Sequence, residues 1–276
     1  VPTIGDKIDA SILSAASSKL KLIANYGAGY DHIDIKTALQ RGIIVTNTPS
    51  VLTTDTADMT MALILAIPRK LREGHEEMQS GNWKGWSPSA MIGMRITGKK
   101  LGILGMGRIG QAIAKRAIAF DLDINYHNRR RLHENIEKSL SATYWENLEE
   151  MLAAVDILVV SASLNPSSLY LLNAKCLGKM KHSAYIVNIS RGEIIDQKAL
   201  VRQLKDGRLG GAGLDVYDSE EVIGSDFKSL KNVFLLPHMG SSTLEGRIEM
   251  GEKVIINIKT YLDGHRPPDQ IVPSML

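Results

Sequence analysis

The sequence predicts an α/β fold in which helices cover both faces of a parallel sheet. First, short apolar segments typical of buried strands alternate with helical segments over most of the 276 residues. Second, a glycine-rich turn joins one of these strands directly to a helix. Third, ionisable residues follow several of the strands, at the edge where such sheets bind their ligands.

The part of the chain before the glycine-rich turn contains a short strand, a long helix and a connector. Ile43–Val45 is β-branched and apolar, as a buried strand requires. The apolar spacing over Thr56–Gln79 predicts a helix, which Pro68 interrupts. Residues Asn82–Thr97 are rich in Trp, Pro, Gly and Met and predict an irregular connector.

Strands and helices then alternate regularly. The predicted strands are Leu101–Leu104, Asp123–His127, Ile157–Val160, Tyr185–Ile189, Ala212–Leu214 and Val233–Leu236. The predicted helices are Gln111–Ala117, Leu148–Ala154, Ala174–Met180, Gln197–Lys205 and Ile248–Leu262. This alternation is typical of a doubly wound, Rossmann-type sheet.

The turn Gly105–Gly110 has the G-x-G-x-x-G pattern of a dinucleotide site. The first glycine permits a tight turn, the second lets backbone approach a pyrophosphate, and the third lets the helix pack close to the strand. The free N–H groups at the start of the helix can donate hydrogen bonds to the phosphates. The candidate cofactor-binding residues here are Gly105, Gly107, Arg108, Ile109 and Gly110.

The end of the following strand indicates which dinucleotide is preferred. Sites that prefer NAD usually place Asp or Glu there, to accept from the ribose 2′-OH. This chain has Asn128 instead, which does not repel a 2′-phosphate. Arg129 and Arg130, followed by Arg131, can clamp that phosphate through paired donors. We therefore expect NADP(H) to be preferred over NAD(H), with a solvated basic turn as the alternative interpretation.

Three ionisable residues follow later strands: Arg191, Glu220 and His238. Reduction of a ketone by a nicotinamide produces an alkoxide that needs a proton, and a histidine held by a carboxylate can supply it. An arginine can bind a substrate carboxylate through two N–H groups and polarise the adjacent carbonyl. Together they predict reduction of a 2-oxo acid to a 2-hydroxy acid.

The composition of the chain limits the classes of partner and site that we expect. Charged residues make up 23% of the chain and the net charge is +3, so no strong field favours nucleic acid or a membrane. The longest apolar run, Met59–Pro68, is too short to span a bilayer. The only cysteine, Cys176, cannot form an intrachain disulfide, which suits a reducing cytoplasm. No metal site is expected.

The chain resembles the D-2-hydroxyacid dehydrogenase family over nearly its whole length, and within it most closely the glyoxylate/hydroxypyruvate reductases. The segments that carry the resemblance are Gly105–Gly110, Asn188–Gly192, Gly213–Tyr217, Pro237–Thr243, Asn25–Asp34 and Val45–Pro49. The resemblance implies that Arg191 binds the substrate, that His238 is the acid/base, and that Glu220 pairs with His238.

The resemblance also implies further contacts. The backbone N–H groups of Ala28 and Gly29 hold the substrate carboxylate, and Trp86 closes the substrate pocket or, alternatively, is a packing residue of the connector. Asp215 contacts the nicotinamide carboxamide, and Ile189 and Gly240 line the cofactor through their backbone.

The resemblance implies two domains and a homodimer. A dinucleotide-binding domain spans residues 74–240, and a smaller, discontinuous, flavodoxin-like substrate domain comprises residues 1–73 and 241–276. Family members carry additional residues before the point where this sequence starts, so we expect the substrate domain to be incomplete at its N-terminus. The homodimer would use the helix and connector before Gly105.

Two local departures from the family pattern matter. The family usually has Pro directly after the catalytic Glu, whereas here Glu221 follows Glu220, and Asp218 is a third candidate partner of His238. The usual proline in the turn after the fourth strand is absent from Ser161–Ser163, which is expected to loosen that turn.

Other functions stay open from the sequence. One is an NAD-preferring D-2-hydroxyacid dehydrogenase with another substrate. A different class is a nucleotide-sensing binding protein of the corepressor type, which keeps the fold without catalysis. The presence of Arg191, Glu220 and His238 favours an enzyme.

Overall fold

The computed structural model describes residues 1–218 and 225–273. The chain divides into two compact units, which we call the first unit (Val1–Asp55 with Ser241–Leu276) and the second unit (Thr56–Gly240). The later boundary coincides with the expected one at residue 240. The earlier boundary differs from the expected position after residue 73, because apolar residues of the long helix, Met61 and Ile64 among them, are buried in the core of the second unit.

Seven strands in the described part of the second unit form one parallel sheet. They are β3 (Lys100–Leu104), β4 (Asp123–His127), β5 (Thr143–Tyr144), β6 (Ile157–Val160), β7 (Tyr185–Asn188), β8 (Gly211–Leu214) and β9 (Val233–Leu235). Their order is β5-β4-β3-β6-β7-β8-β9, and every pairing is parallel. The strand order reverses between β3 and β6, so the predicted doubly wound sheet is confirmed.

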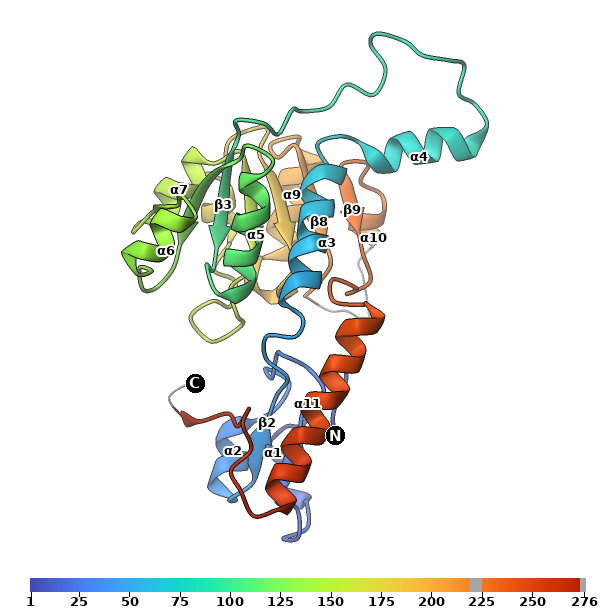
Figure 1. Ribbon diagram of the computed structural model, residues 1–276. Coiled ribbons are helices and arrows are strands. Elements are labelled where there is room, and N and C mark those ends of the chain that lie inside the picture. Colours follow the sequence, from blue (N-terminus) through green and yellow to red (C-terminus); the bar gives the residue numbers. More distant parts are fainter. Residues whose placement is uncertain (219–224, 274–276) are drawn as a thin grey trace. The chain divides into compact units, whose positions relative to one another are not determined.

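Helices cover both faces of this sheet, as Figure 1 shows. On one face the helices are α3 (Thr53–Ala66), α5 (Arg108–Ile118) and α6 (Glu134–Ser139). On the other face they are α7 (Leu148–Ala154), α8 (Ala174–Leu177) and α9 (Gln197–Lys205). Because both faces are covered, the central strands are apolar throughout rather than alternating.

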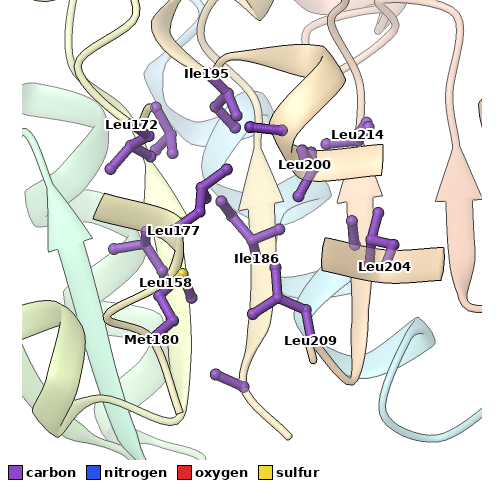
Figure 2. Close-up of a cluster of buried hydrophobic side chains, with 14 of the residues drawn as sticks. Leu158, Leu172, Leu177, Met180, Ile186, Ile195, Leu200, Leu204, Leu209 and Leu214 are labelled. Carbon is purple, nitrogen blue, oxygen red and sulfur yellow. The ribbon is translucent and has the colours of Figure 1, made fainter. Parts of the chain in front are cut away.

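The cluster in Figure 2 shows how the sheet is held under α8 and α9. Leu158 of β6 and Ile186 of β7 point into it and are fully buried. Leu177 from α8 and Leu200 from α9 complete the contacts from the helix side. Burial of side chains of this size is the main source of stability for such a layer, and it keeps the strand ends in fixed positions.

Glycines in β8 allow the chain after α3 to approach the sheet closely. A Cβ atom on Gly213 would lie 2.3 Å from Cδ1 of Ile67, and one on Gly211 would lie 2.8 Å from Cγ2 of the same residue. Neither separation is compatible with normal packing. The side chain of Ile67 therefore occupies the space that strand side chains would otherwise fill.

The helix predicted over residues 56–79 is divided in two, as Pro68 suggested. α3 ends at Ala66, Lys70 adopts a left-handed conformation with φ 55°, and α4 spans Leu71–Ser80. Residues 81–99 contain neither helix nor strand, which confirms the predicted connector. The described part of this unit contains two further short helices, the 3₁₀ helix η1 (Gly192–Ile194) and α10 (Ser225–Lys228).

The first unit has its own small core. The elements of this unit are α1 (Ala10–Ala15), β1 (Leu22–Ala24), α2 (Ile35–Gln40), β2 (Ile44–Thr46) and α11 (Leu244–Leu262). β1 and β2 pair in parallel, and apolar residues such as Leu13, Ile33 and Val45 are buried around them. Among the described residues, no helix has the length and apolar character needed to cross a membrane.

Candidate functional site

Most of the predicted site residues lie at one edge of the seven-stranded sheet. All its strands are parallel, so the segments that follow them emerge at the same edge. The residues that come directly after or soon after β3, β4, β6, β7, β8 and β9 are, in that order, Gly105, Asn128, Ser161, Arg191, Asp215 and His238. The structure thus groups the strand-end loops that the sequence singled out.

The glycine turn combines close backbone contacts with an open space above its second glycine. Gly105 has φ +98°, and a Cβ there would lie 2.5 Å from the nitrogen of Ala162. A Cβ on Gly110 would lie 2.4 Å from the carbonyl oxygen of Gly105, so α5 can approach β3 only with glycine here. A Cβ on Gly107 would meet no atom within 4 Å, so the space above this residue is open. The first and third glycines therefore make the tight turn and the close helix packing predicted for them, and the pyrophosphate contact of the second stays a prediction.

The start of α5 provides donors for an anion. Gly107 is the N-cap residue and contributes no side-chain capping bond, so the first N–H groups of the helix are not used by a cap. These N–H groups belong to Arg108, Ile109 and Gly110, and the positive end of the helix dipole adds to their attraction for phosphate. The described residues in this loop fit a dinucleotide.

Ser161 ties the glycine turn to the neighbouring strand end. Its backbone N–H donates to the carbonyl of Leu104, and its hydroxyl donates to the carbonyl of Gly105 at 2.9 Å. The hydroxyl of Ser190 in turn donates to the carbonyl of Ala162. Hydrogen bonds thus hold the turn that was expected to be loosened by the missing proline. Sequence reasoning missed this role, although a serine directly after a buried strand is a recognisable signal.

Asn128 lies at the end of β4 and contacts the glycine turn. Its Oδ1 accepts the backbone N–H of Met106 at 2.7 Å, and its carbonyl accepts the hydroxyl of Tyr144 at 3.3 Å. Arg129 and Arg130 are exposed, and among the described residues neither has a hydrogen-bond or ion-pair partner. Both guanidinium groups are therefore available to a ligand.

Asn188 positions the loop that carries Arg191. The Asn188 side chain is buried at the end of β7, donates to the carbonyl of Arg191 at 2.9 Å and accepts the N–H of Ser190 at 3.1 Å. The Arg191 guanidinium donates to the carbonyl of Ser190 at 2.8 Å. Ile189, the first residue after β7, is buried beside this loop. The loop conformation is thus fixed by a buried amide that sequence reasoning did not single out.

Asp215 anchors the loop that carries His238. Its carboxylate is 1% exposed, and it accepts the N–H of Met239 through Oδ1 and that of Gly240 through Oδ2, each at 2.7 Å. His238 has φ 54°, a left-handed conformation that costs free energy in a residue other than glycine. The two charge-assisted bonds to Asp215 offset that cost.

The sequence offers three candidates for the carboxylate partner of His238. Glu220 and Glu221 lie outside the described residues. Asp218, the third candidate, has its carboxylate oxygens 3.2 Å from the hydroxyl of Tyr170, which donates to them.

The remaining substrate candidates, Ala28 and Gly29, lie in a loop of the first unit. The buried side chain of Asn25 donates to the carbonyls of Gly27 and Gly29, at 3.0 and 2.8 Å. Asn47 donates to the carbonyl of Ala28 at 2.7 Å. Within the described part of the chain, the N–H groups of Ala28 and Gly29 have no acceptor. This loop can therefore offer two adjacent donors to an anion.

Trp86 lies in the irregular connector. This residue is 83% exposed, so it does not pack against the residues that the structure describes. Among the described residues, no group of three or more His, Cys, Asp or Glu side chains could hold a metal ion.

Comparison with known proteins identifies relatives over the whole chain. Residues 61–240 match the family described as D-isomer specific 2-hydroxyacid dehydrogenase, NAD binding domain. A glyoxylate reductase of Pyrococcus furiosus is 43% identical over 97% of this chain and 80% of its own length.

Two solved structures extend this comparison. A glyoxylate reductase from Paecilomyes thermophila has a TM-score of 0.90 and 36% identity, covering 98% of this chain and 80% of that one. An NADPH-dependent glyoxylate/hydroxypyruvate reductase from Sinorhizobium meliloti, solved with NADP and malonate, has a TM-score of 0.88 and 36% identity, covering 95% and 81%.

Proposed function

The chain belongs to the D-isomer specific 2-hydroxyacid dehydrogenase family and is an NAD(P)-dependent oxidoreductase, and from this premise we propose its substrate, its preferred cofactor and its catalytic residues. The proposed reaction is NADPH-dependent reduction of glyoxylate or hydroxypyruvate to the D-2-hydroxy acid. The observation that carries the proposal is the common edge of one parallel sheet from which the glycine turn, the Arg191 loop and the His238 loop all emerge.

The residues of the glycine turn would hold the cofactor. The open space above Gly107 and the N–H groups of Arg108, Ile109 and Gly110 suit a pyrophosphate. Ile189 and Gly240 would line the remaining length of the cofactor through their backbone, and Asp215 would contact its carboxamide. The bound nicotinamide supplies the hydride.

The preference for NADPH rests on the loop after β4. The Asn128 side chain carries no charge, and its oxygen is occupied by the N–H of Met106. A 2′-phosphate near this residue would therefore meet no carboxylate, while Arg129 and Arg130 can each donate to it. The NADP complex of the Sinorhizobium meliloti relative supports this assignment.

Arg191 and His238 would act on the substrate. The Arg191 guanidinium can bind the carboxylate of a 2-oxo acid and polarise its carbonyl. The imidazole of His238 would donate the proton that the alkoxide oxygen needs, and Glu220 would hold the charged imidazole. Ala28 and Gly29 stay candidates for donors to the substrate carboxylate, and Trp86 for the pocket wall.

A screen of 2-oxo acids against NADPH and NADH, with purified protein, tests the proposal. We expect the highest kcat/KM for glyoxylate or hydroxypyruvate with NADPH. His238→Ala and Arg191→Ala should each abolish turnover while NADPH still binds in a fluorescence titration. Full activity in either variant would remove that residue from the mechanism. Absence of NADPH oxidation with every 2-oxo acid would instead favour the nucleotide-sensing function. The homodimer and the cytoplasmic location remain predictions.

A further inference from the structure

A second buried carboxylate lies next to the loop proposed to bind the 2′-phosphate. It belongs to Glu137 on α6, whose side chain is 8% exposed. Among the acidic residues that the structure describes, Glu137 and Asp215 are the two that are buried. Asp215 anchors the His238 loop, but neither the fold nor the proposed reaction explains why Glu137 is buried. A buried carboxylate lowers stability unless its partners compensate for the lost water.

The partners of Glu137 come from β4 and from the loop that follows it. Arg131 donates to both carboxylate oxygens, from Nε to Oε1 at 2.9 Å and from Nη2 to Oε2 at 2.8 Å. The buried hydroxyl of Tyr126 donates to Oε1 at 2.5 Å. These bonds, Arg131 first, hold the pKa of the Glu137 carboxyl at about 2. Glu137 is therefore ionised at neutral pH and can pair with Arg131 there.

Tyr126 closes the loop at its far end. Its hydroxyl accepts the backbone N–H of Leu132 at 3.0 Å while it donates to Glu137. Burial, with the bond to Glu137, raises the pKa of Tyr126 to about 12, so the hydroxyl keeps the proton that it donates. The chain thus leaves β4 after His127 and returns to a β4 side chain at Leu132.

The loop is held at its beginning as well. Asn128 is fixed by the N–H of Met106 and the hydroxyl of Tyr144, as described above. The guanidinium of Arg131 lies 5.6 Å from the centre of the Tyr144 ring, a cation–π distance. Side-chain interactions therefore fix positions 128, 131 and 132, and the residues between them, Arg129 and Arg130, are exposed.

We propose that Glu137 is a positioning residue for the 2′-phosphate of NADPH, acting through Arg131 to hold Arg129 and Arg130 in place. This inference rests on the proposed function, because it assumes that these two arginines bind the phosphate. The three consecutive arginines then have separate roles. Arg131 is neutralised by Glu137 and shapes the loop, whereas Arg129 and Arg130 contact the ligand.

The two cofactors should respond differently to the loss of Glu137. The glycine turn is also held by Ser161 on the neighbouring strand end, which has no bond to Glu137, so pyrophosphate binding should survive. NADH has no 2′-phosphate and makes no use of the arginine pair. A loop that is no longer fixed should therefore weaken NADPH binding selectively. Ordering the two arginine side chains on binding would then cost conformational entropy and make the binding free energy less favourable.

The experiment measures dissociation constants of NADPH and NADH for the full chain by fluorescence titration. Glu137→Gln keeps the shape of the side chain but removes its charge. We expect the NADPH dissociation constant to rise about tenfold, while that of NADH changes less than about twofold. Tyr126→Phe removes one bond to Glu137 and the acceptor of the Leu132 N–H, but it leaves Arg131 paired with Glu137. This variant should therefore also weaken NADPH binding selectively.

Glu134→Gln is the matched control. Glu134 lies on the same helix and pairs with Lys138 at 2.6 Å, but both side chains are 70% exposed. This variant should bind both cofactors as the unchanged protein does. Thermal unfolding of each variant shows whether it is folded at the titration temperature. If Glu137→Gln is unfolded there, the folded Tyr126→Phe variant decides.

The possible outcomes separate the inference from the proposed function. If the unchanged protein binds NADPH no more tightly than NADH, the proposed phosphate clamp fails, and the inference fails with it. If the unchanged protein prefers NADPH but the folded variants keep the same preference, only the inference is overturned. An equal loss for both cofactors also overturns it, since that result indicates a merely structural role.

Discussion

The carboxylate of Asp215 accepts the backbone N–H of Gly240 at 2.7 Å and so joins the end of β8 to the loop after β9. The N–H of Met239 donates to the other carboxylate oxygen. His238, directly before these residues, is thereby kept in its left-handed conformation. One carboxylate holds the loop from which the proposed proton donor projects.

Asp215→Asn should impair both folding and turnover. The amide offers one acceptor instead of two and directs an NH₂ group at one of the two backbone donors. We expect the free energy of unfolding to fall by about 1–3 kcal/mol and turnover to fall about 100-fold, because His238 is displaced. Urea denaturation and steady-state kinetics measure these changes. The exposed Asp206→Asn change on the same unit serves as control; unaltered kinetics in Asp215→Asn would contradict the anchoring role.

Two glycines of the turn should respond in opposite ways to alanine. In Gly110→Ala the new methyl group would collide with the carbonyl of Gly105, so the free energy of unfolding should fall by about 1–3 kcal/mol. In Gly107→Ala the methyl group enters open space, so stability should change by less than about 1 kcal/mol. Denaturation curves and NADPH titrations of both variants provide the comparison.

The affinity for NADPH should also be affected in Gly107→Ala, the variant whose stability is expected to change little. The methyl group of Gly107→Ala would stand where the pyrophosphate is expected, so NADPH binding should weaken by about tenfold or more despite the intact fold. Normal NADPH affinity in this variant would show that the phosphates lie elsewhere.

Replacing Arg129 and Arg130 together by alanine should shift the cofactor preference toward NADH. Loss of the charge-assisted hydrogen bonds should raise the NADPH dissociation constant by about 10- to 100-fold and leave that of NADH nearly unchanged. Arg202→Ala, an exposed arginine on α9, is the control for loss of surface charge. An unaltered preference in the double variant would exclude the arginine pair from phosphate binding.

Stability in acid should depend on Glu137. The native pKa of about 2 lies below the ordinary value of 4.5, so the contribution of this group is complete above pH 4.5. As the pH falls from 4.5 toward 2, the unfolded chain takes up the proton first and stability decreases. Below pH 2 both states are protonated and the contribution is lost.

Urea denaturation of the unchanged protein and of Glu137→Gln, over this pH range, measures the effect. The stability difference between the two should be constant above pH 4.5 and shrink toward pH 2. A difference that does not vary with pH would mean that folding does not lower the pKa of the Glu137 carboxyl.

The sequence was most informative where local pattern and burial agree. β4, β6, α7 and α9 have the predicted bounds, because each combines a buried apolar pattern with clear ends. α6 and β5 were not predicted. The residues of α6, Glu134–Ser139, contain a single apolar side chain, and the helix is held through the contacts of Glu137 with β4 and its loop. Such tertiary contacts leave no periodic signal in the sequence.

The same limit applies to the candidate site. The positions of Arg191, Asp215 and His238 after their strands followed from the pattern of a parallel sheet. The hydrogen bonds that fix these loops could not be predicted from that pattern. They join residues far apart in the chain, such as Asp215 and Gly240. Hydrogen-bond partners of this kind depend on the register of neighbouring strands, which a single sequence does not specify.

The contact between Gly213 and Ile67 constrains how this protein can vary. A methyl group added at position 213 fits only if the side chain at position 67 moves or becomes shorter. Homologues with alanine at position 213 should therefore carry a smaller residue at position 67, and the two exchanges should be found together. Alanine at position 213 alone would cause a collision, and a smaller residue at position 67 alone would leave a void. The residues at these two positions should therefore change together in evolution.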